Sequence, residues 1–377
     1  MKSLIPSDSC NEDYKIYKDS VIPDLYRKMS DEELSSRIQK ARQSLGNSLV
    51  ILGHHYQRDE IIQHADFQGD SLKLSQEAAQ RKDVKYIVFC GVHFMAESAD
   101  ILSTDEQIVI LPNMSAGCSM ADMANITQVE RCWDELNEAG INDAIPVTYI
   151  NSAADLKAFV GKQGGIVCTS SNAPRVVDWA LKQSKRVLFF PDQHLGRITA
   201  FNLGIPLEAM VVWDPSLKMG GHLCEELIKK QILLWKGYCS VHARFNIAQI
   251  QKAREAYPDI KVIVHPECSL DVVQAADEYG STEFICKRIR ESAPGSKWAV
   301  GTEINLVNRL VNEMPDKLIF CLDPMICPCA TMFQIHPAYL CWVLEELVQG
   351  RVVNQVRVPN EIKQWAKIAL NRMLELK

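Results

Sequence analysis

Short apolar runs alternate along this chain with amphipathic stretches, and this alternation constrains the fold more than any other feature. NSLVILG, KYIVFCG and EQIVILP are rich in β-branched residues, and stretches with helical spacing such as SLKLSQEAAQR lie between them. The cycle returns with AIPVTYIN, GGIVCTS, KRVLFFPD and MVVWDP, and again with IKVIVHPE, TEFICKR, KWAVGTE and KLIFCLDP. Strands that alternate with helices of about 10–15 residues predict βαβ units and therefore an α/β fold with parallel sheets.

Three blocks of similar make-up predict three domains around a shared site. The first strand of each block ends in a polar cluster, which reads HHYQ, YINS or HPEC. Because ligands bind beside the carboxyl ends of parallel strands, three such clusters predict one central site. The expected domains span 46–140, 141–245 and 246–340, after a helical extension over 1–45 and before a C-terminal helical segment over 341–377.

The composition predicts a soluble cytoplasmic protein without a nucleic-acid or membrane partner. The chain has 377 residues with a formal net charge of −6, and its basic residues form no long run. The apolar stretch VKYIVFCGVHFMA is too short and too interrupted to span a bilayer. The N-terminal MKSLIPSDSCNEDYK has no continuous apolar region of the kind found in signal peptides.

Thirteen cysteines are many for such a chain, and most are expected to be buried apolar thiols. One cysteine of each block lies instead in a loop of small or polar residues: Cys118, Cys239 and Cys327. Their separations of 121 and 88 residues exclude the local spacing of a zinc ribbon or a ferredoxin. From the residues alone, these three cysteines are either inert thiols or ligands of one shared metal site.

Ten strings in the same order resemble those of the quinolinate synthase family: GHHYQ, GDSLKLS, TYINS, TSSNA, FFPDQHLG, GYCSVH, VHPEC, GSTEFI, GTEINLVNRL and CPCATM. The resemblance covers about residues 46–345, and the longer N-terminal region resembles the longer-chain branch of the family. It implies a transferase of NAD biosynthesis that condenses iminoaspartate with dihydroxyacetone phosphate and dehydrates the product to quinolinate. It also implies three pseudo-symmetric three-layer αβα domains around a central [4Fe–4S] cluster with three cysteine ligands.

By this resemblance the cluster ligands are Cys118, Cys239 and Cys327. Cys327 is preferred to Cys329 because the third ligand of the family directly precedes a proline. Three thiolates leave one iron open, and an open iron can act as a Lewis acid in a dehydration.

The resemblance also implies the residues that handle substrate. On the residues alone, each hydroxyl at a helix start could equally cap its helix, and the resemblance favours substrate contact. The expected catalytic residues are Tyr56, His242, His265 and Glu267. The expected substrate contacts are His54, Ser71, Tyr149, Asn151, Ser170, His265, Glu267, Ser281 and Thr282.

Two other classes of protein compete with this interpretation. A non-enzymatic iron–sulfur redox sensor would also need many cysteines, but it would not need convergent acid–base and anion-binding groups. A zinc-dependent aldolase or dehydratase would need a catalytic lysine or a two-histidine metal motif, and neither is evident. A transient contact with the L-aspartate oxidase that supplies iminoaspartate is a further expectation.

Overall fold

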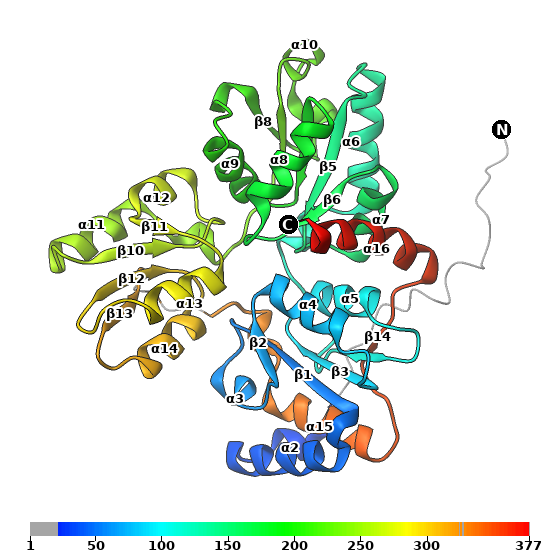
Figure 1. The fold of residues 1–377 in the computed structure, drawn as a ribbon, viewed down its shortest axis with the longest axis vertical. Helices are drawn as coiled ribbons and strands as arrows, with labels where there is room; N and C mark the ends of the chain where they lie inside the picture. The colour runs from blue at the N-terminus through cyan, green and yellow to red at the C-terminus, as the bar shows by residue number, and fades with distance from the viewer. Residues whose placement is uncertain (1–21, 324, 326–327, 377) are drawn as a thin grey trace.

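The computed structural model describes residues 22–323, 325 and 328–376 of the chain. In this part of the chain the strands form three separate sheets, each covered by its own helices (Figure 1). We name these units domain 1, domain 2 and domain 3, in chain order. The predicted α/β fold with short parallel sheets is confirmed, whereas the residue ranges given for the domains stay predictions.

Domain 1 has a sheet in the order β14-β4-β3-β1-β2, in which all pairings are parallel except that of β14 with β4. Its central strands are buried along their whole length, as apolar runs in a doubly covered parallel sheet should be. The strands are β1 (Leu49–His54), β2 (Phe67–Gly69), β3 (Tyr86–Cys90), β4 (Ile108–Ile110) and β14 (Gln355–Val356). The helices are α1 (Asp24–Arg27), α2 (Asp31–Leu45), α3 (Asp59–Ile62), α4 (Ser71–Gln80), α5 (His93–Leu102) and α15 (Pro337–Val348).

Domain 2 has a five-stranded parallel sheet in the order β6-β5-β7-β9-β8. Its strands are β5 (Ala144–Tyr149), β6 (Ile166–Cys168), β7 (Arg186–Phe190), β8 (Met210–Trp213) and β9 (Ile232–Trp235). Its helices are α6 (Ile126–Glu138), α7 (Ala154–Lys162), α8 (Ala173–Gln183), α9 (Gln193–Asn202), α10 (Cys224–Leu227) and α16 (Asn360–Glu375).

Domain 3 has a four-stranded parallel sheet in the order β11-β10-β12-β13. Its strands are β10 (Lys261–Val264), β11 (Glu278–Tyr279), β12 (Lys297–Gly301) and β13 (Leu318–Cys321). Its helices are α11 (Ile247–Ala256), α12 (Leu270–Ala275), α13 (Thr282–Arg290) and α14 (Ile304–Glu313).

The threefold repeat predicted from the sequence pattern is present in the strand order. In each sheet the first strand in the chain lies between the second and the third, as in β2-β1-β3, β6-β5-β7 and β11-β10-β12. The polar cluster of each block therefore follows a central strand of its sheet. Among the described helices, none is long and apolar enough to cross a lipid bilayer.

One apolar run, TEFICKR, was predicted to be a strand, and this prediction is wrong because the run forms helix α13. The side chain of Ser281 caps the helix by accepting a hydrogen bond from the amide of Phe284. Ile285, Cys286 and Ile289 are buried on one side of the helix, at the spacing of an amphipathic helix. A short apolar run does not by itself distinguish a strand from a turn of buried helix.

Candidate active site

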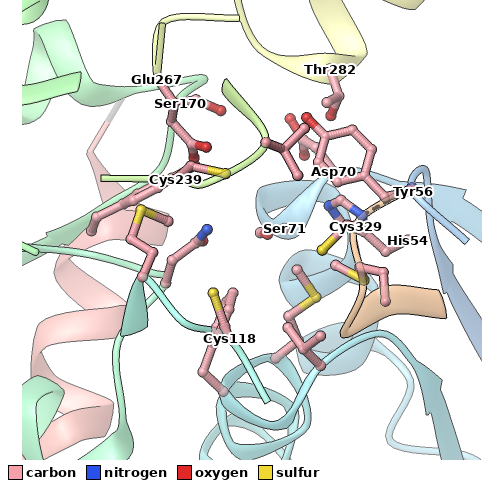
Figure 2. A pocket seen from close by; sticks show the side chains of 18 of the residues that line it. His54, Tyr56, Asp70, Ser71, Cys118, Ser170, Cys239, Glu267, Thr282 and Cys329 are labelled. Atoms are coloured by element: carbon pink, nitrogen blue, oxygen red, sulfur yellow. Dashed lines mark hydrogen bonds between the residues drawn. The ribbon is translucent and has the colours of Figure 1, made fainter. Parts of the chain in front are cut away.

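A cavity lies where the three domains meet. Figure 2 shows side chains from separate segments of the chain pointing into it. The sequence predicted many of the residues that line it: His54, Tyr56, Ser71, Cys118, Tyr149, Asn151, Ser170, Cys239, His265, Glu267 and Thr282. The strand order explains this convergence, because the carboxyl ends of all three central strands point to the cavity.

Helices α4, α8 and α13 present their N-terminal ends to the cavity. Each of them follows the second strand of its domain. Ser71 is the first residue of α4, Thr282 is the first residue of α13, and Ser170 lies three residues before α8. Free N–H groups and the positive end of the helix dipole favour anions at such positions. The cavity is therefore suited to a ligand, or a pair of ligands, with several negative groups.

One side of the cavity is formed by polar side chains and is called the polar wall: His54, Tyr56, Tyr149, His265 and Glu267. Glu267 is the carboxylate of this wall. Its Oε1 accepts a 2.6 Å hydrogen bond from the hydroxyl of Tyr149, and its Oε2 lies 2.7 Å from Nδ1 of His242. Burial alone would raise the pKa of Glu267, but His265, His242 and the Tyr149 hydroxyl outweigh it and hold the pKa below the ordinary value. This carboxyl group is therefore ionised at neutral pH although it is almost fully buried.

The imidazoles and phenols of the cavity are neutral. Burial lowers the pKa of His54 to about 3 and that of His265 to about 3. Burial also raises the pKa of Tyr56 and that of Tyr149 well above the ordinary value for a phenol. These side chains therefore offer hydrogen bonds without net charge, beside the negative charge of Glu267.

Asn151 offers the cavity an unused acceptor. Its Oδ1 is buried and has no hydrogen-bond partner among the described residues, and its side chain lines the cavity. A buried polar atom without a partner costs free energy unless a ligand or water satisfies it. This unpartnered oxygen is consistent with the predicted ligand contact of Asn151, which stays a prediction.

Three thiols face this cavity, those of Cys118, Cys239 and Cys329 (Figure 2). Burial raises the pKa of Cys118 to about 12 and that of Cys239 well above the ordinary value. Such thiols become thiolates when a metal cation stabilises the negative charge. The donor set therefore fits a metal centre with soft sulfur ligands. The predicted ligand Cys327 lies outside the described residues.

The same turn is built around each of these three thiols. In every case the cysteine carbonyl accepts a hydrogen bond from the amide four residues later, a 3₁₀ helix begins three residues after the cysteine, and an α-helix begins eight residues after it. The three turns run from Cys118 through η2 (Ala121–Met123) to α6, from Cys239 through η5 (His242–Arg244) to α11, and from Cys329 through η6 (Met332–Gln334) to α15.

Two predicted site residues do not line the cavity. Ser281 is the cap of helix α13, and His242 is fully buried behind the wall. Their predicted roles in substrate binding and catalysis stay predictions. Sequence reasoning in turn missed several lining residues, among them Asp70, which caps α4 directly before Ser71 and therefore had a local signal.

Glu303 is a further residue that sequence reasoning did not single out, although it lies in the string GTEINLVNRL. It caps helix α14 through the amides of Asn305 and Leu306. Its other oxygen accepts a 3.1 Å hydrogen bond from the amide of Cys329. Burial raises the pKa of Glu303 to about 7. This side chain ties the turn of Cys329 to the first residues of α14.

Comparison with known proteins agrees with this geometry. The family model described as "Quinolinate synthetase A protein" matches residues 36–375. A quinolinate synthase of Corynebacterium glutamicum is 57% identical over 360 residues, which cover 95% of this chain and 91% of the relative. A quinolinate synthase of Herpetosiphon aurantiacus is 58% identical over 356 residues, covering 93% of this chain and 94% of the relative. The resemblance noted in the sequence is thereby confirmed, and the chain belongs to the quinolinate synthetase A protein family of enzymes.

Proposed function

We propose that this enzyme forms quinolinate from iminoaspartate and dihydroxyacetone phosphate, as a step of NAD biosynthesis. The relatives are named quinolinate synthase, and the cavity supports the same activity here. The observation that carries the proposal is the meeting of three equivalent cysteine turns with three helix N-termini in one cavity. A group of thiols with a purely structural role would not require the three helix N-termini. A site that only binds anions would not require the three thiols.

We further propose that Cys118, Cys239 and Cys329 hold a [4Fe–4S] cluster. The shared turn favours Cys329 over Cys327, because Cys329 stands at the position equivalent to the other two thiols. A cluster held by three thiolates keeps one iron without a protein ligand, and that iron supplies a Lewis acid for the loss of a hydroxyl group.

The substrates match the charges of the cavity. Together they carry two carboxylates and one phosphate, and the cavity offers the N-termini of α4, α8 and α13 with Ser71, Ser170 and Thr282 beside them. Each helix end favours one anionic group through its free N–H groups and its dipole. We assign these three ends to the three anionic groups as a set, without pairing them individually.

We assign proton transfer to the side chains of the polar wall. The ionised carboxylate of Glu267 can take a proton from substrate carbon or nitrogen, and the neutral phenols of Tyr56 and Tyr149 can give one. The neutral imidazole of His265 lies beside Glu267, with 3.9 Å between Nδ1 and Oε2. Such a set suits repeated enolisation and water loss.

The decisive experiment is anaerobic purification followed by iron and sulfide analysis and a quinolinate assay. Iminoaspartate is generated in the assay from oxaloacetate and ammonia, and dihydroxyacetone phosphate is added. We expect about four irons per chain and quinolinate formation. A cluster without turnover would instead favour the iron–sulfur redox sensor, and stoichiometric zinc in a colourless protein would refute the cluster.

A matched pair of variants tests the third ligand. Cys329→Ala should lose the cluster as completely as Cys118→Ala and Cys239→Ala, whereas Cys327→Ala should keep most of it. The reverse result for Cys327 and Cys329 would restore the assignment made from the sequence.

A cytoplasmic location and a transient contact with L-aspartate oxidase also belong to this proposal. Direct transfer from that oxidase would protect the unstable iminoaspartate from hydrolysis. In a coupled assay, an inactive variant of this chain added in excess should then lower the quinolinate yield. An unchanged yield would indicate transfer through free solution.

A further inference from the structure

Asp70 of domain 1 is hydrogen-bonded to Ser171 of domain 2 at the edge of the cavity. The hydroxyl of Ser171 donates to Oδ2 of Asp70 over 2.6 Å, although the two residues are 101 positions apart in the chain. Asp70 lines the cavity and is 6% exposed, whereas Ser171 is exposed and does not line it. A hydroxyl-to-carboxylate bond of this length is charge-assisted and is therefore stronger than a bond between neutral groups.

This hydrogen bond joins the two residues that stand next to hydroxyls of the cavity. Asp70 directly precedes Ser71, the first residue of α4, and Ser171 directly follows Ser170, which lies before α8. Ser71 and Ser170 both line the cavity. The bond therefore acts on the separation of the two helix starts that carry these hydroxyls.

The other oxygen of the Asp70 carboxylate caps helix α4. Oδ1 accepts a 2.9 Å hydrogen bond from the amide of Lys73. Each carboxylate oxygen thus has a donor, one from domain 1 and one from domain 2. A carboxylate that was free to turn would compete with an anionic ligand for the remaining N–H groups of α4. The two donors hold this carboxylate in one orientation.

Domains 1 and 2 also share a continuous apolar core. Because apolar burial is not directional, it does not by itself fix the separation of two particular helix ends. A short hydrogen bond to a carboxylate depends on both distance and angle. The contact between Asp70 and Ser171 therefore adds, beside the cavity, a constraint that the apolar core does not supply.

We propose that Asp70 and Ser171 are positioning residues that hold the starts of α4 and α8 at one separation, so that both helix ends act on the same bound anionic ligand. This inference rests on the proposed function and adds how two of its anion-binding ends are kept together. Neither side chain belongs to the polar wall or to the three cysteine turns. The bond therefore contributes to the binding of substrate and not to the chemical step.

Two substitutions at Ser171 separate its hydroxyl from its size. Ser171→Ala should lower kcat/KM for quinolinate formation about tenfold, the value of one hydrogen bond to a charged group, and should do so through KM. Ser171→Thr keeps the hydroxyl and should stay within about twofold of the parent. A fall in kcat at unchanged KM, or equal losses in the two variants, would overturn the inference.

Ser216→Ala is the matched control. The hydroxyl of Ser216 also donates to an aspartate over 2.6 Å, but its acceptor Asp214 lies two residues away in the same exposed loop. Loss of this local bond should leave KM and kcat unchanged. A rise in KM as large as that of Ser171→Ala would show that the loss does not depend on the link between α4 and α8, and would overturn the inference.

A double-mutant cycle tests whether Ser171 acts through Asp70. Asp70→Ser keeps an oxygen that can cap α4 but leaves no second carboxylate oxygen for Ser171. In this background Ser171→Ala should cause no further rise in KM, because the bond is already absent. Independent, multiplying losses would overturn the inference.

Hydrogen exchange without substrate keeps the inference separate from the proposed function. In the anaerobically purified holoenzyme, Ser171→Ala should speed amide exchange at the starts of both α4 and α8 about fivefold, and Ser171→Thr should not. Unchanged exchange in Ser171→Ala would overturn the inference even if quinolinate is formed. Faster exchange at both helix starts, with a parent protein that forms no quinolinate, would refute the proposed function and leave the link between the helices intact.

Discussion

Domain 1 meets domain 2 and domain 3 through junctions of opposite character. Toward domain 2 the apolar core is continuous, and it includes buried residues of helices α15 and α16. Helix α16, which follows strand β14 of the first sheet, packs closely against α7 of domain 2. Figure 1 shows this C-terminal helix crossing between the two domains. Domain 3 has two smaller apolar clusters, one of which also includes Ile198 of helix α9 in domain 2.

The junction of domains 1 and 3 is polar instead. Arg309 of α14 donates to the carbonyls of His55 and Gln57 and to the carboxylate of Asp59. These acceptors flank Tyr56, whose own carbonyl accepts a hydrogen bond from Asn305. Burial of apolar area is not directional, whereas hydrogen bonds to a guanidinium fix position and orientation. The apolar junction therefore contributes stability without fixing orientation, whereas the polar junction contributes stability and also sets the geometry of the cavity.

Removal of Arg309 should have the largest effect. Arg309→Ala leaves two carbonyls of the junction without their donor, and we expect a loss of about 3–5 kcal/mol in the free energy of unfolding. Denaturant unfolding measures it. Arg290→Ala is the matched control, because its pair with Glu313 is exposed and should contribute at most about 1 kcal/mol. Equal losses in the two variants would contradict the role of Arg309 in holding the polar junction.

Acidification should weaken the polar junction before the apolar one. His54 and His265 have pKa values of about 3 in the folded protein and about 6.5 when unfolded. The unfolded chain therefore binds more protons across this interval, and stability falls as pH falls from about 6.5 toward 3. At pH 5 each of these two imidazoles should lower the free energy of unfolding by about 2 kcal/mol relative to neutral pH.

Hydrogen exchange at pH 7 and at pH 5 checks this prediction. Amides of α14 should lose protection at the lower pH before those of α7 and α16. His54→Asn should reduce the pH slope by about one proton. Uniform loss of protection across both junctions would show that the two open together.

A methyl group at Gly161 tests the apolar junction. The added Cβ would lie 2.0 Å from the backbone oxygen of Trp365 in α16, so that α16 would have to move away from α7. Gly161→Ala should cost about 1–3 kcal/mol and should leave the cysteine turns intact. Gly117→Ala, where a Cβ meets nothing within 4 Å, is the control in thermal unfolding. An unchanged stability in Gly161→Ala would mean that α16 contributes little to the junction.

The smallest effect is expected at the rim of the polar junction. Glu283 lies 2.9 Å from Nε2 of His55 and 3.6 Å from Nζ of Lys73, and its side chain is 41% exposed. Exposed ion pairs contribute little, so Glu283→Gln should cost less than about 1 kcal/mol, and less at high salt. Unfolding in low and high salt measures both. A loss as large as that of Arg309→Ala would place Glu283 among the main supports of the junction.

Local patterns in the sequence were sufficient for ten of the fourteen described strands, all except β2, β9, β11 and β14, and for the polar residues that follow the first strand of each domain. The clusters at 54–56, 149–151 and 265–267 were predictable because each follows an apolar run, and parallel strands bring their carboxyl ends together. The TEFICKR run was not predictable, because a short buried helix and a short buried strand have similar composition. Ser281 likewise fits a cap and a ligand contact equally well by sequence.

The sequence by itself determined the three α/β repeats, the cysteines of the first two loops and the hydroxyls at the helix starts. These features depend on periodicity and on neighbours within a few residues. Only the tertiary structure decided that Cys329 stands in the same turn as Cys118 and Cys239, and that Thr302 joins Tyr56 to His242. The cysteine turns are local, but their equivalence depends on hydrogen bonds and helix starts that only the structure shows. Thr302, in contrast, joins segments far apart in the chain through side-chain packing between domains. No spacing along the sequence encodes that packing directly.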